Sequence, residues 1–464
     1  MRVLLVVYDN GAHVSHYPIG LGYIAAALRN DGHDITVYSQ DVHHYPDSHL
    51  TAYLDANRFD MVGVSVIGGY YQYRKLLALS GAINASTQRP FYVIGGHGPS
   101  PEPEYFLRKT GADAVVIGEG EITACELAEA VEIHSSLSEI LGIAYRVGDA
   151  VYVNPRRPLV RDIDTIAMPA YDLFDMEHYR LDPPWSVHGK ATDFTGMMLS
   201  GRGCTFTCNF CYRLDEGFRP RGNESIIAEI EYLQEHYAVN HILFYDELLM
   251  SSVARTESLC HAMIERGLKV QWDCNGRLNY AKPELLRLMR RAGCVFINYG
   301  IESFDDAALK AMGKALTTKQ VVAGVEATLA VGISPGLNII WGNIGETRET
   351  LQKGVDFLLK YDDGGQMRTI RPVTPYPGSP LYYEAIRRGM LKDVADFYEN
   401  KHLNSDLAAV QFTGLSDAEF HEALYHANTQ LFDNYFGRKL AQTKEAARKL
   451  YLEGDPNFRG FRPV

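Results

Sequence analysis

Strand-like apolar runs alternate with helical patterns through two long stretches of the chain. In the first stretch, residues 1 to about 125, the strand-like runs are Val3–Tyr8, Asp34–Tyr38, Asp60–Val66, Phe91–Ile94 and Asp113–Ile117. Helical patterns fill the intervals at Gly20–Arg29, Leu50–Asn57, Tyr70–Ile83 and Glu104–Lys109. This alternation predicts an open parallel sheet of the Rossmann-like or flavodoxin-like kind. Ligands of such sheets bind at the carboxyl ends of the strands.

The second stretch, residues 191 to about 380, repeats the alternation at the pace of βα units. Its strand-like runs are Phe194–Ser200, His241–Tyr245, Val270–Cys274, Val295–Gly300, Gly336–Trp341 and Met367–Val373. Helices are expected at Ser225–His236, Val253–Arg266, Pro283–Ala292, Thr318–Val331 and Arg348–Leu359. These units predict a partial, TIM-like (β/α)6 barrel with its active site at the carboxyl ends of the strands.

Shorter elements separate and follow these two regions. Ile122–Ile133 predicts a helix, and Gly142–Val147 with Ala150–Asn154 predicts a hairpin, since Gly148 accepts the positive φ of a tight turn. The tail is expected to contain the helices Leu381–Gly389, Val394–Glu399, Asp417–Tyr435 and Gln442–Leu452. We therefore expect an N-terminal domain (1–135), a connector (136–190), a barrel (191–380) and a helical C-terminal domain (381–464) that caps the substrate site.

Three cysteines follow the first strand of the expected barrel. Cys204, Cys208 and Cys211 have the spacing C-x3-C-x2-C. Three thiolates on one loop can hold three corners of a [4Fe-4S] cluster and leave the fourth iron open. A structural zinc site would need a fourth ligand, and the nearest histidines, His188 and His236, are distant in sequence. A disulfide would leave one thiol over, and no secretion signal is present.

The other cysteines, Cys125, Cys260, Cys274 and Cys294, are scattered and read as buried apolar residues. The net charge of −12 disfavours a nucleic-acid partner, because affinity for phosphate backbones comes from clustered Lys and Arg. The apolar run Met1–Val7 is too short for a signal peptide, and no segment has 18 apolar residues in succession. We expect no membrane span and a cytoplasmic location.

The cysteine loop, with Phe210 and Tyr212 on either side of Cys211, resembles the signature of the radical S-adenosylmethionine enzymes. The motifs Gly300-Ile301-Glu302-Ser303 and Gly342-Asn343-Ile344-Gly345-Glu346-Thr347 resemble later strand ends of that family, although Ile344 stands where proline is common. The resemblance implies a cluster on the three cysteines that cleaves S-adenosylmethionine to a 5′-deoxyadenosyl radical. It also implies S-adenosylmethionine contacts at Phe210, Tyr212, Asp246, Glu247, Arg277, Glu302, Ser303, Gly342 and Asn343.

The small residues after the first-domain strands resemble the cobalamin-binding domain found ahead of many radical enzymes. The residues implied to contact cobalamin are Asn10, Gly20, Tyr23, Ser65, Val66, Gly68, Gly69, Gly95, Gly96, His97, Gly118, Glu119 and Gly120. The D-x-H-x-x-G loop of the cobalamin mutases is missing, since His13 and His16 have the wrong spacing, but the radical enzymes usually lack it too. A sheet that keeps the fold without a cofactor is the alternative.

The combined resemblance implies a cobalamin-dependent C-methyltransferase. A methyl cation equivalent cannot attack a saturated carbon without a lone pair, so a radical must be made first. The alternatives are a non-methylating cyclisation, rearrangement or C–C coupling of the anaerobic porphyrin cyclase type, a cobalamin sensor with an inert barrel, and a nucleic-acid-modifying enzyme. The expected partners are a small-molecule or peptide substrate and an electron donor such as flavodoxin or ferredoxin. No residue is identified as an acid or base.

Overall fold

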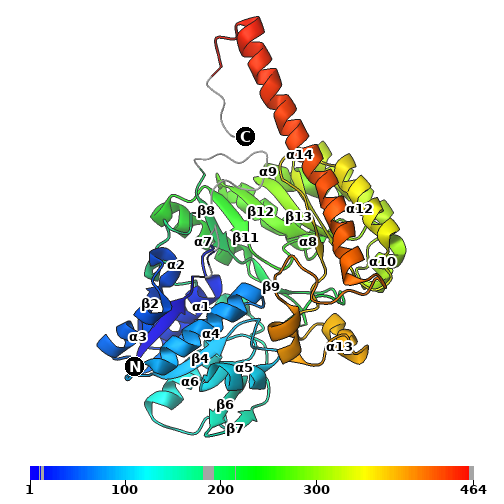
Figure 1. Ribbon diagram of the computed structural model, residues 1–464. Helices are drawn as coiled ribbons and strands as arrows, with labels where there is room; N and C mark the ends of the chain where they lie inside the picture. The colour runs from blue at the N-terminus through cyan, green and yellow to red at the C-terminus, as the bar shows by residue number, and fades with distance from the viewer. Residues whose placement is uncertain (10, 12–14, 181–192, 215, 459–464) are drawn as a thin grey trace.

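The computed structural model describes residues 1–9, 11, 15–180, 193–214 and 216–458. Two largely parallel sheets, each covered by helices, make up most of the molecule (Figure 1). The first sheet comes from the N-terminal part of the chain and the second from its middle part. Of the residues discussed above, Asn10, His13 and His188 lie outside the described ranges.

The first sheet has the strand order β2-β1-β3-β4-β5-β6-β7. Its strands are β1 (Arg2–Val7), β2 (Asp34–Ser39), β3 (Met61–Ser65), β4 (Phe91–Gly95), β5 (Ala114–Val116), β6 (Ile143–Val147) and β7 (Ala150–Val153). The first five are parallel, as expected, and β6 and β7 are antiparallel. The hairpin assigned to the connector from sequence thus continues the first sheet.

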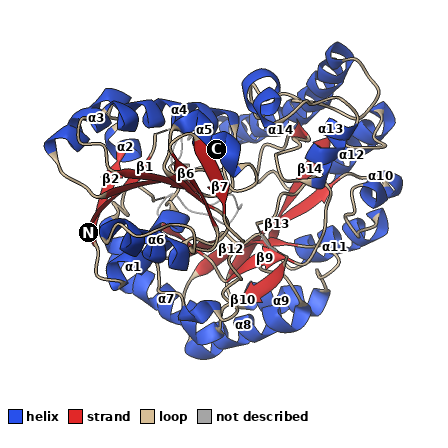
Figure 2. Cartoon of the chain, turned by 90° about the horizontal axis from the view of Figure 1, so that it is seen from below, coloured by secondary structure: helices blue, strands red, loops and turns tan. Residues whose placement is uncertain are grey.

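Helices cover both faces of this sheet, which explains why β1 is apolar from Val3 to Val7. One face carries α1 (Ile19–Asn30) and α6 (Glu121–Glu132), and the other carries α3 (Asp47–Ala56), α4 (Tyr70–Ala85) and α5 (Pro103–Thr110) (Figure 2). Val3, Leu5 and Val7 of β1 join the core on the first of these faces, and Leu4 and Val6 join the core on the second. The short α2 (Gln40–His43) follows β2.

The second sheet is parallel throughout, with the order β15-β14-β13-β12-β11-β8. Its strands are β8 (Thr195–Met198), β11 (His241–Phe244), β12 (Gln271–Gly276), β13 (Cys294–Glu302), β14 (Ser334–Trp341) and β15 (Ile370–Pro372). The helices between them are α7 (Asn223–Tyr237), α8 (Val253–Arg266), α9 (Pro283–Arg291), α10 (Asp306–Ala311), α11 (Thr318–Ala330) and α12 (Arg348–Lys360). Because β8 and β15 form opposite edges, the barrel is incomplete, which confirms the expected fold class.

Two details of the barrel could not be seen in the sequence. The cysteine loop is bounded by an antiparallel hairpin of β9 (Gly201–Cys204) and β10 (Gly217–Pro220), where only a loop was expected. Two short 3-10 turns, η1 (Ile163–Thr165) and η2 (Tyr171–Leu173), lead toward the barrel. None of the described helices combines the length and the apolar character that crossing a membrane requires.

The C-terminal region contains α13 (Pro380–Arg387), the π-helix η3 (Asp396–Lys401) and α14 (Asp417–Glu453). The two helices expected at Asp417–Tyr435 and Gln442–Leu452 are one continuous helix, so that prediction was wrong. Gly437 weakens a helix by about 1 kcal/mol relative to alanine, which long flanking helical segments tolerate. Asn428 of α14 bonds both backbone groups of Ile370 and so covers the edge strand β15. Figure 1 shows α14 running beside α12 and then projecting outward.

Candidate active site

The cysteine loop leaves the barrel through the β9–β10 hairpin. Cys204 is the last residue of β9 and pairs with Gly217 of β10. Farther along the loop, the amide of Cys211 donates to the carbonyl of Cys208 at 3.3 Å, which forms a turn between these two cysteines. The three thiols therefore lie on a backbone that the hairpin and the turn both restrain.

Asn209, between two of the cysteines, anchors the loop to three other segments. Its amide donates to Met312 O, and its carbonyl accepts from the amide of Leu381 at the start of α13. Its side chain exchanges two hydrogen bonds with the buried side chain of Asn343, at 3.0 and 2.9 Å. Asn343, implied to contact S-adenosylmethionine, thus holds the cysteine loop in the structure.

The thiols of Cys208 and Cys211 lie within hydrogen-bonding distance of each other. A hydrogen bond from the Cys211 thiol, assisted by the charges of Lys314 and Arg277, lowers the pKa of Cys208. The same contact and burial raise the pKa of Cys211, and burial raises that of Cys204. A lowered thiol pKa beside two cations favours iron binding, because the thiolate is the ligand form.

The three thiols fit a cluster better than a single ion. Among the described residues, no three metal-ligating side chains converge on one point. A [4Fe-4S] cluster instead distributes three thiolates over three iron atoms. The donor set is therefore compatible with the expected cluster.

Arg277 lies over the cysteine loop from the end of β12. Its guanidinium carbon is 3.4 Å from the centre of the Phe206 ring, and it donates to the carbonyl of Lys314. Burial lowers the pKa of Arg277, while Cys208 and Cys204 act in the opposite direction. The side chain is 6 % exposed, so its positive charge acts in a medium of low polarity.

A lysine that sequence reasoning missed completes this group. Lys314 donates to Glu302 Oε1 at 2.9 Å, and both side chains are buried. Burial opposes the charge of Lys314, but Glu302 and then Cys208 outweigh it and raise its pKa. The only signal in the sequence was a lysine shortly after a strand-end glutamate, which is too common to single out.

Glu302 occupies a strained position at the end of β13. Its φ is +72°, unusual for a residue other than glycine, and the pairing of β13 with β14 shifts register there. Gly300 makes room for the carboxylate, because a Cβ there would lie 2.3 Å from Glu302 Oε1. Strain of this kind concentrates at functional sites. The next residue, Ser303, is also buried.

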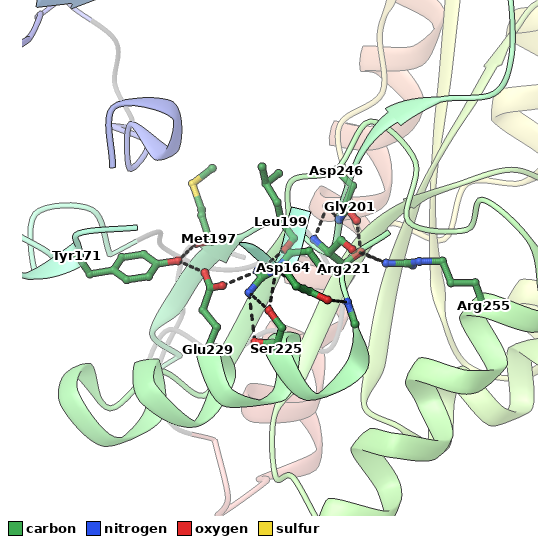
Figure 3. Close-up of polar contacts among 12 residues, drawn as sticks. Asp164, Tyr171, Met197, Leu199, Gly201, Arg221, Ser225, Glu229, Asp246 and Arg255 are labelled. Carbon is green, nitrogen blue, oxygen red and sulfur yellow. Dashed lines mark hydrogen bonds and ion pairs between the residues drawn. The ribbon is translucent and has the colours of Figure 1, made fainter. Parts of the chain in front are cut away.

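Asp246 and Glu247, adjacent in sequence, have different surroundings. The carboxylate of Asp246 is 1 % exposed and accepts from the Ser200 hydroxyl and the amides of Ser200 and Gly201, the latter two at 2.6 and 3.3 Å (Figure 3). Arg255 donates to Ser200 O at 2.6 Å. Burial raises the pKa of Asp246. Glu247 is exposed, and its charge adds to the effect of burial in raising the pKa of Cys204, so the two side chains lie near each other.

The hydrogen-bond network of Figure 3 continues from β8 to the connector. Arg221 donates to Leu199 O at 2.8 Å and to Glu229, whose other oxygen accepts from Tyr171 at 2.6 Å. Glu229 is 1 % exposed, and Tyr171 also donates to Met197 O. Every charged group in this network has a partner, which is typical of a structural role.

The remaining S-adenosylmethionine candidates lie around the loop. Gly342 and Asn343 donate their amides to Glu346 Oε2 at 2.9 and 3.0 Å, and burial raises the pKa of Glu346 to about 7. Phe210 lies 5.9 Å from the Lys314 ammonium, and Tyr212 faces the His97 ring. The residues Cys204, Cys208, Cys211, Arg277, Glu302, Phe210 and Tyr212 are thus brought together, whereas Asp246 belongs to the network of Figure 3.

The carboxyl edges of the two sheets face each other. Four loops that follow strands of the first sheet lie against different parts of the barrel region. The residue pairs in contact are His16 with Tyr245, Gly68 with Tyr376, His97 with Tyr212, and Glu119 with Arg202. In each of the two aromatic pairs, His16 with Tyr245 and His97 with Tyr212, the ring centroids lie 6.2 Å apart. Ile67 and Tyr245, on these facing edges, remain 57 % and 50 % exposed. Side chains between the sheets are therefore accessible to solvent.

The loop after β4 shows why small residues are needed on this edge. Gly96 has a φ of +97°, and a Cβ there would lie 2.5 Å from Val66 O and 3.1 Å from Ser65 Oγ. Gly20 and Gly118 have open space where a side chain would stand. Gly95 adjoins Val116, and Gly69 precedes α4 beside Gln72. A flat backbone surface with open space suits a bulky ligand such as cobalamin.

Tyr23, Glu119 and Gly120 were also expected to contact cobalamin. In the structure Glu119 accepts from Arg202 and Arg219, and Arg202 lies 4.8 Å from the Tyr23 ring. Burial opposes ionisation of Glu119, but these arginines lower its pKa. A Cβ at Gly120 would lie 2.8 Å from Ile24. The cobalamin contacts of these three residues stay predictions.

Comparisons with known proteins agree with this arrangement. Residues 198–358 match the family described as the Radical SAM superfamily, and residues 7–128 match the B12 binding domain. An uncharacterized methyltransferase of Pyrococcus horikoshii is 30% identical over 402 residues, which cover 84% of each chain. The anaerobic magnesium-protoporphyrin IX monomethyl ester cyclase of Rubrivivax gelatinosus is 25% identical over 98% of this chain and 81% of its own.

Among solved structures, the fold resembles the methyltransferase TsrM from Kitasatospora setae, described as a radical S-adenosylmethionine methyltransferase with cobalamin and a [4Fe-4S] cluster bound. The TM-score is 0.70 at 20% identity, covering 83% of this chain and 78% of that one. At this identity the similarity establishes the fold.

Proposed function

The chain belongs to the cobalamin-dependent radical S-adenosylmethionine enzymes, and we propose that it methylates an unactivated carbon of a small-molecule or peptide substrate. The observation that carries this proposal is the opposition of the two strand-end edges. It brings the glycine-lined loops of the first sheet against the cysteine loop, through contacts such as His97 with Tyr212. When bound, the cluster supplies the electron that cleaves S-adenosylmethionine, and cobalamin carries the methyl group.

The residues of the chain bind and orient these groups. We assign cluster binding to Cys204, Cys208 and Cys211. The carboxylates of Glu302 and Glu247 would receive the methionyl ammonium, and Arg277 would pair with the methionyl carboxylate through two parallel hydrogen bonds. Lys314 compensates the buried charge of Glu302 until the ligand binds.

The remaining contacts complete this assignment. Phe210, Tyr212, Ser303 and Gly342 would line the S-adenosylmethionine site, and Asn343 would act through Asn209. Cobalamin would lie on Gly20, Ser65, Val66, Gly68, Gly69, Gly95, Gly96, His97 and Gly118. We also propose the cytoplasm as the location, an electron donor such as flavodoxin or ferredoxin as partner, and functional units at 1–135, 136–190, 191–380 and 381–464.

A second candidate is an oxidative cyclisation without methyl transfer. It is supported by the similarity to the anaerobic porphyrin ester cyclase over 98% of the chain. The same scaffold would then position a carbon radical for oxidation and ring closure.

Product counting separates the two candidates. Anaerobically reconstituted protein, with and without hydroxocobalamin, is reduced in the presence of S-adenosylmethionine. Methyl transfer predicts both 5′-deoxyadenosine and S-adenosylhomocysteine. Deoxyadenosine alone, with cobalamin still bound, would favour cyclisation. Failure to retain cobalamin would contradict both.

A further inference from the structure

Arg202 stands on the strand that leads into the cysteine loop. It lies two residues before Cys204 in β9 and pairs across the hairpin with Arg219 of β10. The two guanidinium groups extend from this hairpin toward the first sheet, where they meet the segment after β5. One short hairpin thus connects the cluster loop to the cobalamin-binding region.

The contacts of Arg202 are directional. Its two terminal nitrogens donate to Glu119 Oε1 at 2.9 Å and to Glu121 Oε1 at 2.6 Å. Its guanidinium carbon lies 4.8 Å from the centre of the Tyr23 ring, a cation–π distance. A planar group held by two carboxylates and a ring has one available orientation.

Arg219 secures the other side of the same carboxylate. It donates to both oxygens of Glu119, at 2.9 and 2.8 Å, and to Val160 O at 2.6 Å. The side chains of Arg202, Arg219, Glu119 and Glu121 are exposed by 16%, 15%, 11% and 9%. A pair this buried adds little net stability, because desolvation offsets the attraction, but losing one partner leaves an uncompensated charge. The network therefore fixes the position of the hairpin relative to the segment after β5, and it adds little to the stability of the fold.

We propose that Arg202 is a positioning residue that holds the first sheet in register with the cysteine loop, so that the methyl group passes from S-adenosylmethionine to cobalamin. In that transfer the carbon leaves the sulfonium sulfur, which keeps the bonding pair as a thioether, and the electron pair of reduced cobalt forms the new bond. The inference rests on the proposed function. It makes Glu119 and Tyr23 partners of Arg202, in place of the cobalamin contacts implied by resemblance.

Of three measurable steps, one depends on the relative position of the two regions and two do not. Cobalamin binding needs the first sheet alone, and reductive formation of 5′-deoxyadenosine needs the barrel alone. Methyl transfer from S-adenosylmethionine to cobalamin needs both regions in the correct relative position. A misplacement of about 1 Å can slow a reaction about 100-fold. Loss of Arg202 should therefore affect the third quantity selectively.

The experiment compares Arg202→Met, Glu119→Gln and Arg202→Lys with Arg157→Met. Arg157 pairs with Glu126 of α6 and contacts Thr123, so its removal breaks an ion pair on the first sheet, one with a more exposed carboxylate, without touching the hairpin. Each protein is titrated with hydroxocobalamin and assayed for 5′-deoxyadenosine. S-adenosylhomocysteine formed with reduced cobalamin is counted in parallel. Hydrogen–deuterium exchange on the apoprotein gives a readout that does not depend on activity.

For Arg202→Met, we expect faster exchange at 117–124 and 201–204 but not at 241–276. Cobalamin affinity and deoxyadenosine formation should stay within about twofold, while S-adenosylhomocysteine formation falls about 100-fold. Arg202→Lys should recover part of the S-adenosylhomocysteine formation, because the positive charge is kept. Arg157→Met should match the wild type in all measurements.

Unchanged S-adenosylhomocysteine formation in Arg202→Met would overturn the inference. So would a parallel loss of all three quantities, because that pattern indicates general unfolding. If the wild type itself forms no S-adenosylhomocysteine with cobalamin, the proposed function fails instead.

Discussion

Two buried charged networks flank the cysteine loop, and they differ in how completely their groups are paired. In the network of Figure 3, both oxygens of Asp246 accept hydrogen bonds, and Glu229 is shared by Arg221 and Tyr171. On the other side, the ammonium of Lys314 has one hydrogen-bond partner, Glu302, among the described residues. Complete pairing suits a structural role, whereas spare donors beside a thiol of lowered pKa suit a ligand.

Strain distinguishes the two networks as well. Glu302 has a backbone φ of +72° and depends on Gly300 for space, whereas Asp246 does not share this feature. The comparison indicates that the carboxylates at the ends of two strands of one barrel, β11 and β13, divide between two tasks. The following substitutions test that division, from the largest expected effect to the smallest.

Cys208→Ala should abolish cluster binding and 5′-deoxyadenosine formation, because one of the three thiolates is lost. Iron content, visible absorbance and electron paramagnetic resonance would measure the loss. Cys125→Ala is the matched control, since Cys125 lies on α6, away from the loop, and should leave all three signals unchanged. A Cys208→Ala protein that retains a full cluster would disprove the ligand assignment.

Lys314→Met should lower the free energy of unfolding of the apoprotein by about 3 kcal/mol, because Glu302 is left as an unpaired buried charge. S-adenosylmethionine, whose ammonium can replace the lost partner, should restore part of this stability. Thermal unfolding with and without the ligand measures both effects. Lys310→Met, exposed on α10, should change neither, and a stable Lys314→Met protein would remove the distinction between the networks.

Asp246→Asn should lower the free energy of unfolding by about 1–3 kcal/mol, because an amide cannot accept all the hydrogen bonds of this buried carboxylate. Its affinity for S-adenosylmethionine should stay close to that of the wild type when measured on folded protein by calorimetry. A stable variant that loses the ligand would restore the role implied by resemblance, with Asp246 as the receptor of the amino group.

Glu247→Gln should show the opposite pattern with the smallest effect on stability. Glu247 is exposed, so its substitution should change the free energy of unfolding by no more than about 0.5 kcal/mol. Affinity for S-adenosylmethionine should fall several-fold through loss of a charge near Cys204. If Asp246→Asn and Glu247→Gln proved indistinguishable, the division between the two carboxylates would be wrong.

Most of the fold was predictable because periodicity marks strands and helices. The strands around Val3 and His241, the helix Val253–Arg266 and the carboxyl-end position of Cys204 all follow from local pattern. The continuity of α14 through Gly437 was not predictable, because a glycine has the same appearance in a break and in a tolerated interior position. The β9–β10 hairpin was hidden because its strands, Gly-Arg-Gly-Cys and Gly-Phe-Arg-Pro, lack the apolar run or alternation that marks a strand.

The site was predictable where chemistry is local in sequence, as in the cysteine triad. It was not predictable where partners are distant. The bond of Lys314 with Glu302, the reciprocal amides of Asn209 and Asn343, and the pairing of Arg202 with Glu119 join residues 12, 134 and 83 positions apart. Asp246 illustrates the limit, because its position after a strand is the same whether it faces a ligand or Ser200.

Electron paramagnetic resonance gives the most direct test of whether cobalamin and the cluster lie close together. Reduced cluster and cobalt(II) cobalamin are both paramagnetic, so electron paramagnetic resonance of protein carrying both reports their separation. If the strand-end edges of the two sheets enclose cobalamin opposite the cysteine loop, reducing the cluster should broaden the cobalt signal and speed its relaxation, and Cys208→Ala should remove the effect. A tightly bound cobalamin whose signal does not respond to the cluster would contradict the account.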